Sequence, residues 1–148
     1  MANVNAMAWS AALVAVTAAM AIGCGPSFLD RAAAEPGAVK SPTGLVMRTL
    51  VEGAGEAPKE SDTVRVHYVG QFIDGVVFDS SVERNKPAEF PVGKVIACWT
   101  EGLQKMKVGG KARFVCPSWI AYGDQGKPPA IPGMATLVFE VELLAIVK

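Results

Sequence analysis

Beyond Thr43, the pattern of apolar and polar residues is mostly that of short β-strands. Over 64–69, for example, an apolar set that includes Tyr68 alternates with a more polar set that includes His67. This period of two places the two sets on opposite faces of a half-buried strand. Asp74-Gly75 separates two such runs and predicts a tight hairpin turn. The strand-like runs cover 45–50, 64–69, 76–80, 88–92, 111–116 and 135–147.

One segment has helical spacing instead. Trp99, Leu103 and Met106 lie at positions i, i+4 and i+7, which share one face of a helix of about two turns. Gly109-Gly110 is predicted to end this helix. The expected architecture is therefore an antiparallel β-sheet with one short helix against one face, which is an α+β fold.

The N-terminal segment has a different character. Residues 6–22 are a run of 17 mostly small or apolar residues, at the lower limit of length for a membrane-spanning helix. The run ends in Ala21-Ile-Gly-Cys24, which resembles the lipobox of bacterial lipoproteins, where the cysteine is lipidated and becomes the mature N-terminus. We expect residues 1–23 to be a signal peptide of this lipoprotein type, with Cys24 as the lipidation site.

Two other interpretations of this segment stay open. Ala21 stands where the lipobox usually has leucine, and a positively charged leader region is missing. Ala19-Met-Ala21 also fits an ordinary signal-peptidase site, and an uncleaved N-terminal anchor is the third possibility. The lipoprotein interpretation places the domain outside the cytoplasm, anchored by lipid on the periplasmic side of a bacterial membrane.

Residues 24–42 are expected to be a flexible linker. They hold three prolines and two glycines among a short alanine run, and no apolar periodicity persists there. A linker of this length leaves no room for a dimerisation module, so we expect a monomer. The globular domain is expected to span residues 43–148.

Composition excludes several classes of function. The chain has 14 basic and 14 acidic residues, so there is no excess of positive charge for binding nucleic acid. A single histidine excludes His-rich metal sites. The sequence contains no phosphate-binding loop, dinucleotide fingerprint or nucleophile elbow. Neither a cofactor nor a metal is predicted.

Seven segments, in this order and spacing, resemble the FKBP family of peptidyl-prolyl cis-trans isomerases. The resemblance covers about residues 43–148 and includes bacterial periplasmic members of the macrophage-infectivity-potentiator type. The segments are Val66-His-Tyr-Val-Gly70, Phe78-Asp-Ser-Ser81, Arg84-Asn-Lys-Pro87, Val95-Ile96 with Trp99, Gly102-Leu with Met106-Lys-Val-Gly109, Ala121-Tyr-Gly123 and Ala135-Thr-Leu-Val-Phe-Glu-Val-Glu-Leu-Leu144.

The resemblance implies a twisted antiparallel sheet wrapped around the short helix, with a substrate pocket between them and Trp99 as its floor. The residues that it assigns to catalysis are Tyr68, Asp79, Ile96 through its backbone N–H, and Tyr122. Those that it assigns to substrate binding are Phe78, Arg84, Phe90, Val95, Trp99, Ile131 and Phe139. Taken singly, most of these would be ordinary core or turn residues; their joint occurrence favours a site. His67 is expected to point away from the pocket.

Such a pocket would accelerate rotation about X-Pro bonds in unfolded or flexible polypeptides, without covalent chemistry. The family departures at Ala88, Ile120 and the Lys127-Pro-Pro-Ala130 loop predict a more open rim, which leaves the binding of macrolide inhibitors in question. Two rival functions remain: a non-catalytic chaperone or proline-peptide-binding module, and a structural envelope protein with a vestigial pocket.

Cys98 and Cys116 need separate consideration, and 17 residues lie between them. The first begins the predicted helix, and the second ends a strand expected to pack beneath it. An exported domain would reach a compartment that permits a disulfide. Two free buried thiols are the alternative.

Overall fold

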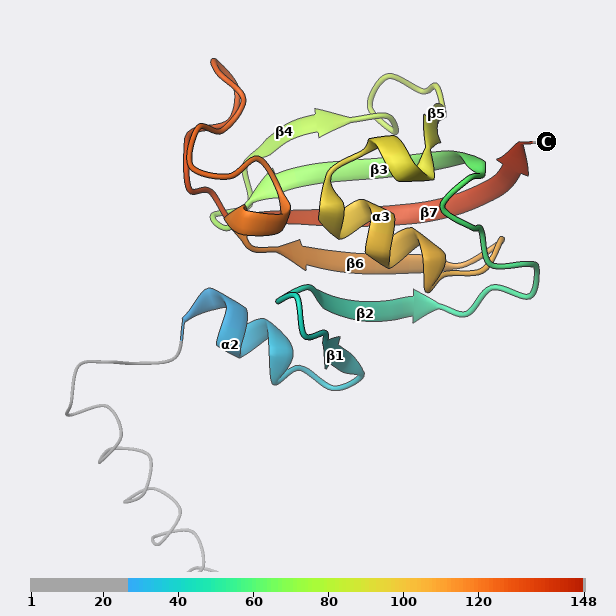
Figure 1. Ribbon diagram of the computed structural model, residues 1–148, viewed down its shortest axis with the longest axis horizontal. Coiled ribbons are helices and arrows are strands. Elements are labelled where there is room, and N and C mark those ends of the chain that lie inside the picture. Colours follow the sequence, from blue (N-terminus) through green and yellow to red (C-terminus); the bar gives the residue numbers. More distant parts are fainter. Residues whose placement is uncertain (1–26, 148) are drawn as a thin grey trace, which may run out of the picture.

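The computed structural model of the chain describes residues 27–147, which form a seven-stranded antiparallel sheet with a helix on each face (Figure 1). The strand order is β1-β2-β6-β7-β3-β4, and β5 also pairs with β3. The strands are β1 Ala38–Lys40, β2 Val46–Val51, β3 Thr63–Phe72, β4 Val77–Ser80, β5 Ala88–Pro91, β6 Lys111–Cys116 and β7 Leu137–Val147. The helices are α2 Phe28–Ala33 and α3 Ala97–Gln104, with short 3-10 turns η1 Val92–Lys94 and η2 Ser118–Ile120.

The predicted α+β fold and its strands are confirmed. The turn at Asp74-Gly75 joins β3 to β4, and Gly75 adopts a φ of +92°, which is unfavourable for residues with a side chain. The Asp74 side chain accepts a hydrogen bond from the backbone N–H of Val76 at 3.0 Å. This turn fixes the register that places β4 beside β3.

Helix α3 is shorter than predicted. It ends at Gln104 rather than near Gly109, although Met106 is buried as its spacing indicates. The N–H of Val108 donates instead to Glu56, and that of Gly109 donates to Leu143. These bonds to distant backbone end the helix before the glycine pair.

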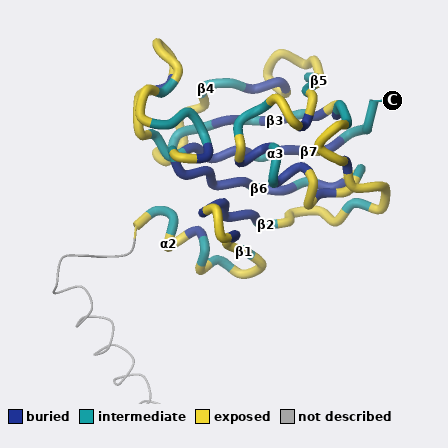
Figure 2. The backbone as a smooth tube through the Cα atoms, in the orientation of Figure 1, coloured by how far each residue is buried: buried dark blue, intermediate teal, exposed yellow. Residues whose placement is uncertain are grey.

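Helix α3 packs directly on the concave face of the sheet, where it forms the main core with β3, β6 and β7 (Figure 2). Gly102 lies over the buried ring of Phe114, and a Cβ atom at this position would come within 2.6 Å of that ring. The close approach of α3 to β6 therefore depends on the absence of a side chain at Gly102.

Cys98 and Cys116 are joined by a disulfide, with their Cα atoms 5.9 Å apart. Cys98 lies in the first turn of α3 and Cys116 ends β6, and both are buried. The bridge ties the helix that carries Trp99 to the centre of the sheet.

The prediction of a flexible linker over 24–42 is wrong for residues 27–42, which the structure describes. Helix α2 begins with a capping box, in which Ser27 and Asp30 bond each other's backbone N–H groups. Ala32 is buried against Val46, Val115 and Val138 on the convex face of the sheet. Strand β1 then pairs with β2. A helix of six residues is too short to show the apolar periodicity on which the prediction depended.

An ion-pair network also holds this segment on the sheet. Glu35 lies 3.4 Å from Arg48 on β2 and 3.7 Å from Arg113 on β6, measured between carboxylate oxygen and guanidinium nitrogen. These partly exposed pairs contribute little individually. Together they place Glu35, the only acidic residue of 31–40, beside cationic side chains on two neighbouring strands.

The predicted signal peptide, residues 1–23, and the predicted lipidation site, Cys24, lie outside the described residues. Within 27–147, neither helix has the length and apolar character needed to cross a bilayer.

Candidate active site

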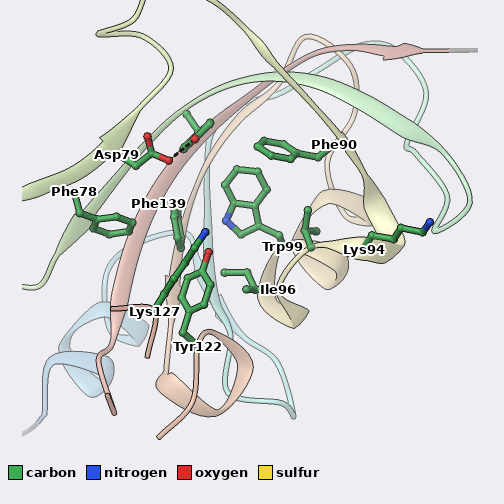
Figure 3. A pocket seen from close by; sticks show the side chains of 11 residues that line it. Phe78, Asp79, Phe90, Lys94, Ile96, Trp99, Tyr122, Lys127 and Phe139 are labelled. Carbon is green, nitrogen blue, oxygen red and sulfur yellow. Dashed lines mark hydrogen bonds between the residues drawn. The ribbon is translucent and has the colours of Figure 1, made fainter. Parts of the chain in front are cut away.

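A hollow of about 330 Å³ opens between α3, the strands β3, β4, β5 and β7, and the segment that follows η2 (Figure 3). This volume is at the lower end of the range for small-ligand pockets. Aromatic side chains from six different segments converge on it. The lining residues are Tyr68, Phe78, Asp79, Phe90, Lys94, Val95, Ile96, Trp99, Tyr122, Lys127 and Phe139.

Trp99 forms the floor of the hollow and is only 4% exposed. Its indole makes edge-to-face contacts with three rings, those of Tyr68, Phe90 and Phe139, at centroid distances of 5.3, 5.4 and 5.3 Å. Each such pair stabilises the packing by about 0.5–1.5 kcal/mol beyond the burial of its area. The indole is therefore held in one orientation by three neighbours.

The indole N–H of Trp99 is buried and has no hydrogen-bond acceptor among residues 27–147. Its nitrogen lies on the side of Phe139, whose ring is nearly perpendicular to the indole at 88° (Figure 3). The aromatic face is a weak acceptor for this group. Among residues 27–147, no strong acceptor therefore lies within hydrogen-bond distance of the indole nitrogen.

Gly70 makes room for one wall of the hollow. A Cβ atom at this position on β3 would lie 2.8 Å from the ring of Phe78 and 2.9 Å from that of Phe139. The two rings instead meet over Gly70, edge to face, with centroids 5.7 Å apart. Any larger residue at position 70 would displace this wall.

The carboxylate of Asp79 lies at the edge of the hollow and is fully engaged. The hydroxyl of Tyr68 donates to it at 2.5 Å, and the guanidinium of Arg84 donates to its other oxygen at 2.5 Å. Arg84 also donates to the Tyr68 hydroxyl at 3.2 Å. This closed triad satisfies a charge that sits beside an aromatic wall.

The triad shifts the pKa values of its members. Burial raises the pKa of Asp79, but hydrogen bonds from Tyr68 and Arg84 outweigh it, so the pKa lies below its ordinary value. Burial, followed by the hydrogen bond to Asp79, raises the pKa of Tyr68. Hydrogen bonds to Asp79 and Tyr68 raise the pKa of Arg84. At neutral pH the carboxylate is therefore ionised and the phenol is protonated.

Ser81 positions Tyr68 from behind. Its buried hydroxyl accepts the backbone N–H of Tyr68 at 2.8 Å and lies 2.9 Å from Nδ1 of His67. His67 lines no part of the hollow, as the strand alternation predicted. The histidine thus belongs to the support of the strand pair and not to the site.

Besides the buried indole N–H of Trp99, two further hydrogen-bond donors at the hollow have no partner in the described chain. Ile96 precedes α3, and its carbonyl accepts from the N–H groups of Trp99 and Thr100. The N–H of Ile96 itself donates to no group within 27–147. The hydroxyl of Tyr122 is likewise unpaired there, and it points into the hollow (Figure 3). Both donors are free to bind carbonyl oxygens of a ligand.

The structure brings together most of the residues assigned to the site from the sequence. Tyr68, Phe78, Asp79, Phe90, Val95, Ile96, Trp99, Tyr122 and Phe139 all line the hollow. Two do not line it. Arg84 lies behind Asp79 as a partner of its carboxylate, and Ile131 is 3% exposed within the core.

Two lining residues were not predicted. Lys94 ends η1, and Lys127 lies in the loop after η2. A lysine in a loop is usually solvated. The residues around each of these lysines show no apolar periodicity that would place the lysine at a site. The only available signals were the nearness of Lys94 to Val95-Ile96 and of Lys127 to Tyr122.

Replacing Asp79 with asparagine should lower the melting temperature at pH 7 by about 2–4 °C, because a neutral amide accepts weaker bonds from Tyr68 and Arg84. The pKa of Asp79 is lowered in the folded state, so its stabilisation is present above the ordinary value of about 3.9 and is lost as the pH falls through the folded value. The difference between wild type and variant should therefore shrink on acidification.

Thermal unfolding of both proteins, followed by circular dichroism between pH 7 and pH 3, checks this prediction. Asp124→Asn, the same change at an exposed position, is the control. A difference at Asp79 that stays constant, or that grows as the pH falls, would show that the carboxylate is not stabilised by the triad.

Residues 54–144 match the family described as FKBP-type peptidyl-prolyl cis-trans isomerase. The chain is 48% identical over 122 residues to the FKBP-type 22 kDa peptidyl-prolyl cis-trans isomerase of Escherichia coli K12, covering 82% of this chain and 59% of that protein. It is 46% identical to a macrophage infectivity potentiator of Trypanosoma cruzi, covering 82% of this chain and 63% of that protein.

Solved structures of peptidyl-prolyl cis-trans isomerases show the same similarity. The crystal structure of FkpA from Escherichia coli superposes with a TM-score of 0.78 at 49% identity, covering 80% of this chain and 55% of that one. A peptidyl-prolyl cis-trans isomerase from Pseudomonas syringae gives 0.76 at 39% identity, covering 82% and 89%. The chain thus spans 59% or less of the bacterial curated relatives named FKBP-type 22 kDa isomerase and FkpA.

The family match covers strands β3 to β6, most of β7, helix α3 and all residues that line the hollow. Together with the identity to these relatives, it establishes that this chain belongs to the FKBP family of peptidyl-prolyl cis-trans isomerases.

Proposed function

We propose that this protein is a peptidyl-prolyl cis-trans isomerase that accelerates rotation about X-Pro bonds by binding the proline in the hollow above Trp99. The observation that carries the proposal is the combination of a buried aromatic floor with two unpaired donors, the N–H of Ile96 and the hydroxyl of Tyr122. The floor fits a proline ring, and the donors fit the carbonyl groups on either side of it.

The reaction requires a loss of amide resonance and no change of covalent bonds. Resonance gives the planar imide a barrier of ~18–20 kcal/mol and makes it more charge-separated than the twisted form. An apolar pocket lacks the water that stabilises this charge separation, so it binds the twisted form in preference to the planar one. A thousandfold acceleration requires about 4 kcal/mol, which shape and one or two hydrogen bonds can supply.

Asp79 is proposed to orient the bound peptide and not to transfer a proton. Its two oxygens are already occupied by Tyr68 and Arg84. An ionised carboxylate at the rim can interact with the substrate carbonyl carbon or hold the wall in place. The triad also fixes the ring of Tyr68, which forms part of the aromatic box.

The substrates are proposed to be unfolded or flexible segments that contain X-Pro, since only these can enter a hollow of this size. Macrolide ligands are a second class that the hollow could bind. The protein is proposed to act as a monomer and to assist protein folding. The rival function, a chaperone or proline-peptide-binding module without turnover, uses the same hollow and must be separated by experiment.

An isomerisation assay on the purified chain, with a proline tetrapeptide observed by NMR exchange, tests the proposal. The wild type should accelerate cis-trans exchange. Tyr122→Phe keeps the ring but removes the donor, and should lower kcat/KM by about five- to tenfold. Trp119→Phe changes an exposed aromatic residue outside the hollow and serves as the control.

Peptide binding without any acceleration would support the non-catalytic rival. Neither binding nor acceleration would indicate a vestigial pocket in a structural protein.

We also propose that the protein is exported and anchored on the periplasmic side of a bacterial membrane through lipid on Cys24. The support is the apolar run of 6–22 followed by Ala21-Ile-Gly-Cys24. Only Gly25 and Pro26 separate this cysteine from Ser27, which caps α2. Because α2 and β1 pack on the sheet, such an anchor would hold the domain close to the bilayer.

The intact mass of the mature protein, isolated from a bacterial host, tests this proposal. The expected result is a chain that begins at Cys24 and carries the mass of a diacylglyceryl group. An unmodified chain that begins at Ile22 would exclude the anchor but keep export, and an uncleaved chain would exclude both signal-peptide interpretations.

A further inference from the structure

The charged residues around the hollow give it an excess of positive charge. Three charged residues line it, namely Asp79, Lys94 and Lys127. The charge of Asp79 is cancelled by Arg84, which lies 2.5 Å away. Neither lysine has an ion-pair partner within residues 27–147. The whole chain has a formal net charge of zero, so this local excess of positive charge is not a consequence of a basic protein.

Lys127 is held at the rim by its backbone. Its N–H donates to the carbonyl of Ile131 at 2.8 Å, and the N–H of Ile131 donates back to its carbonyl at 2.9 Å. Ile131 is itself buried in the core. Gly126, with a φ of +68°, allows this tight turn, because a Cβ atom there would lie 2.4 Å from the Ile131 carbonyl oxygen. The turn that presents Lys127 is therefore anchored.

The side chain of Lys127 extends alongside Tyr122 toward the hollow (Figure 3). Its ammonium nitrogen lies 5.7 Å from the centroid of the Tyr122 ring, within the range of a cation–π contact. Lys94 lies on the other side of Trp99, and its amine is directed away from the hollow in the same view. Of the two cations, Lys127 is thus the nearer to the donor expected to hold a substrate carbonyl.

We propose that Lys127 makes the site select X-Pro segments with an acidic side chain next to the proline. The inference rests on the proposed function, since it assumes a proline over Trp99 and a carbonyl at the Tyr122 hydroxyl. Neighbouring residues of an extended peptide are about 3.3–3.6 Å apart along the chain. The side chain that flanks the proline then comes within reach of the Lys127 ammonium, and a carboxylate is favoured there over a neutral or cationic group.

The size of the effect follows from the exposure of the rim. Lys127 is exposed, so an ion pair with a bound peptide is screened by water and salt. Exposed pairs of this kind change an equilibrium by about two- to fivefold. Screening over a Debye length of about 10 Å at 0.1 M salt means that the preference should be largest at low ionic strength.

A matched peptide series tests the inference on the full chain. Blocked tetrapeptides carry Glu, Gln or Lys either immediately before or immediately after the proline. Their kcat/KM is measured by NMR exchange, and their affinity by chemical-shift titration, at low salt and in 0.5 M NaCl. For at least one of the two positions, the wild type should favour Glu over Gln by about two- to fivefold and disfavour Lys.

The variant Lys127→Gln should bring the Glu/Gln ratio close to one, whereas Lys94→Gln should change it little, because the Lys94 amine is directed away from the hollow. Lys40→Gln, on β1 at the far edge of the sheet, should leave the ratio unchanged. High salt should reduce the wild-type ratio in the same direction as Lys127→Gln.

The inference would be overturned if the Glu and Gln peptides had equal kcat/KM and equal affinity at both positions. A Glu/Gln ratio that stays the same in the variant Lys127→Gln would also overturn it. Failure of the proposed function gives a different result, because no peptide would then be isomerised faster. In that case the affinities alone still decide whether Lys127 selects acidic segments.

Discussion

The site depends on one physical constraint, the fixed orientation of the Trp99 indole. Three aromatic edges or faces surround this ring, from Tyr68, Phe90 and Phe139, and they come from three different strands. Helix α3 must therefore lie at one depth on the sheet for the hollow to exist. Gly102 permits that depth, and the bridge from Cys98 to β6 ties the same helix turn to the sheet.

The polar groups of the site are arranged so that the floor stays apolar. The charged groups of the triad lie at the edge of the hollow. There Asp79, Tyr68 and Arg84 form hydrogen bonds with one another. The unpaired donors of Ile96 and Tyr122 lie at the opposite side of the hollow, where a peptide backbone would pass. A site of this kind can bind and distort a substrate but holds no group poised for nucleophilic attack, which fits a reaction that only rotates a bond.

Much of this arrangement could be predicted from the sequence, because its signals are local. The alternation over 111–116 gives β6 with its observed bounds, and Asp74-Gly75 marks the hairpin. The aromatic residues of the hollow were predicted from the family resemblance. The periodicity of one segment cannot show which residues of distant strands lie together. The features that the sequence did not predict depend on tertiary contacts. Helix α2 is too short to show an apolar periodicity and is stabilised by its packing on the sheet. Lys127 reaches the rim of the hollow through the backbone hydrogen bonds that its turn makes with Ile131.

The most direct test of the account is an NMR measurement of where a proline peptide lies when bound to the protein. The account predicts nuclear Overhauser effects between the proline ring protons and the Trp99 indole, together with a shift of the Ile96 amide resonance. Contacts of the proline with the exposed indole of Trp119, and none with Trp99, would contradict it.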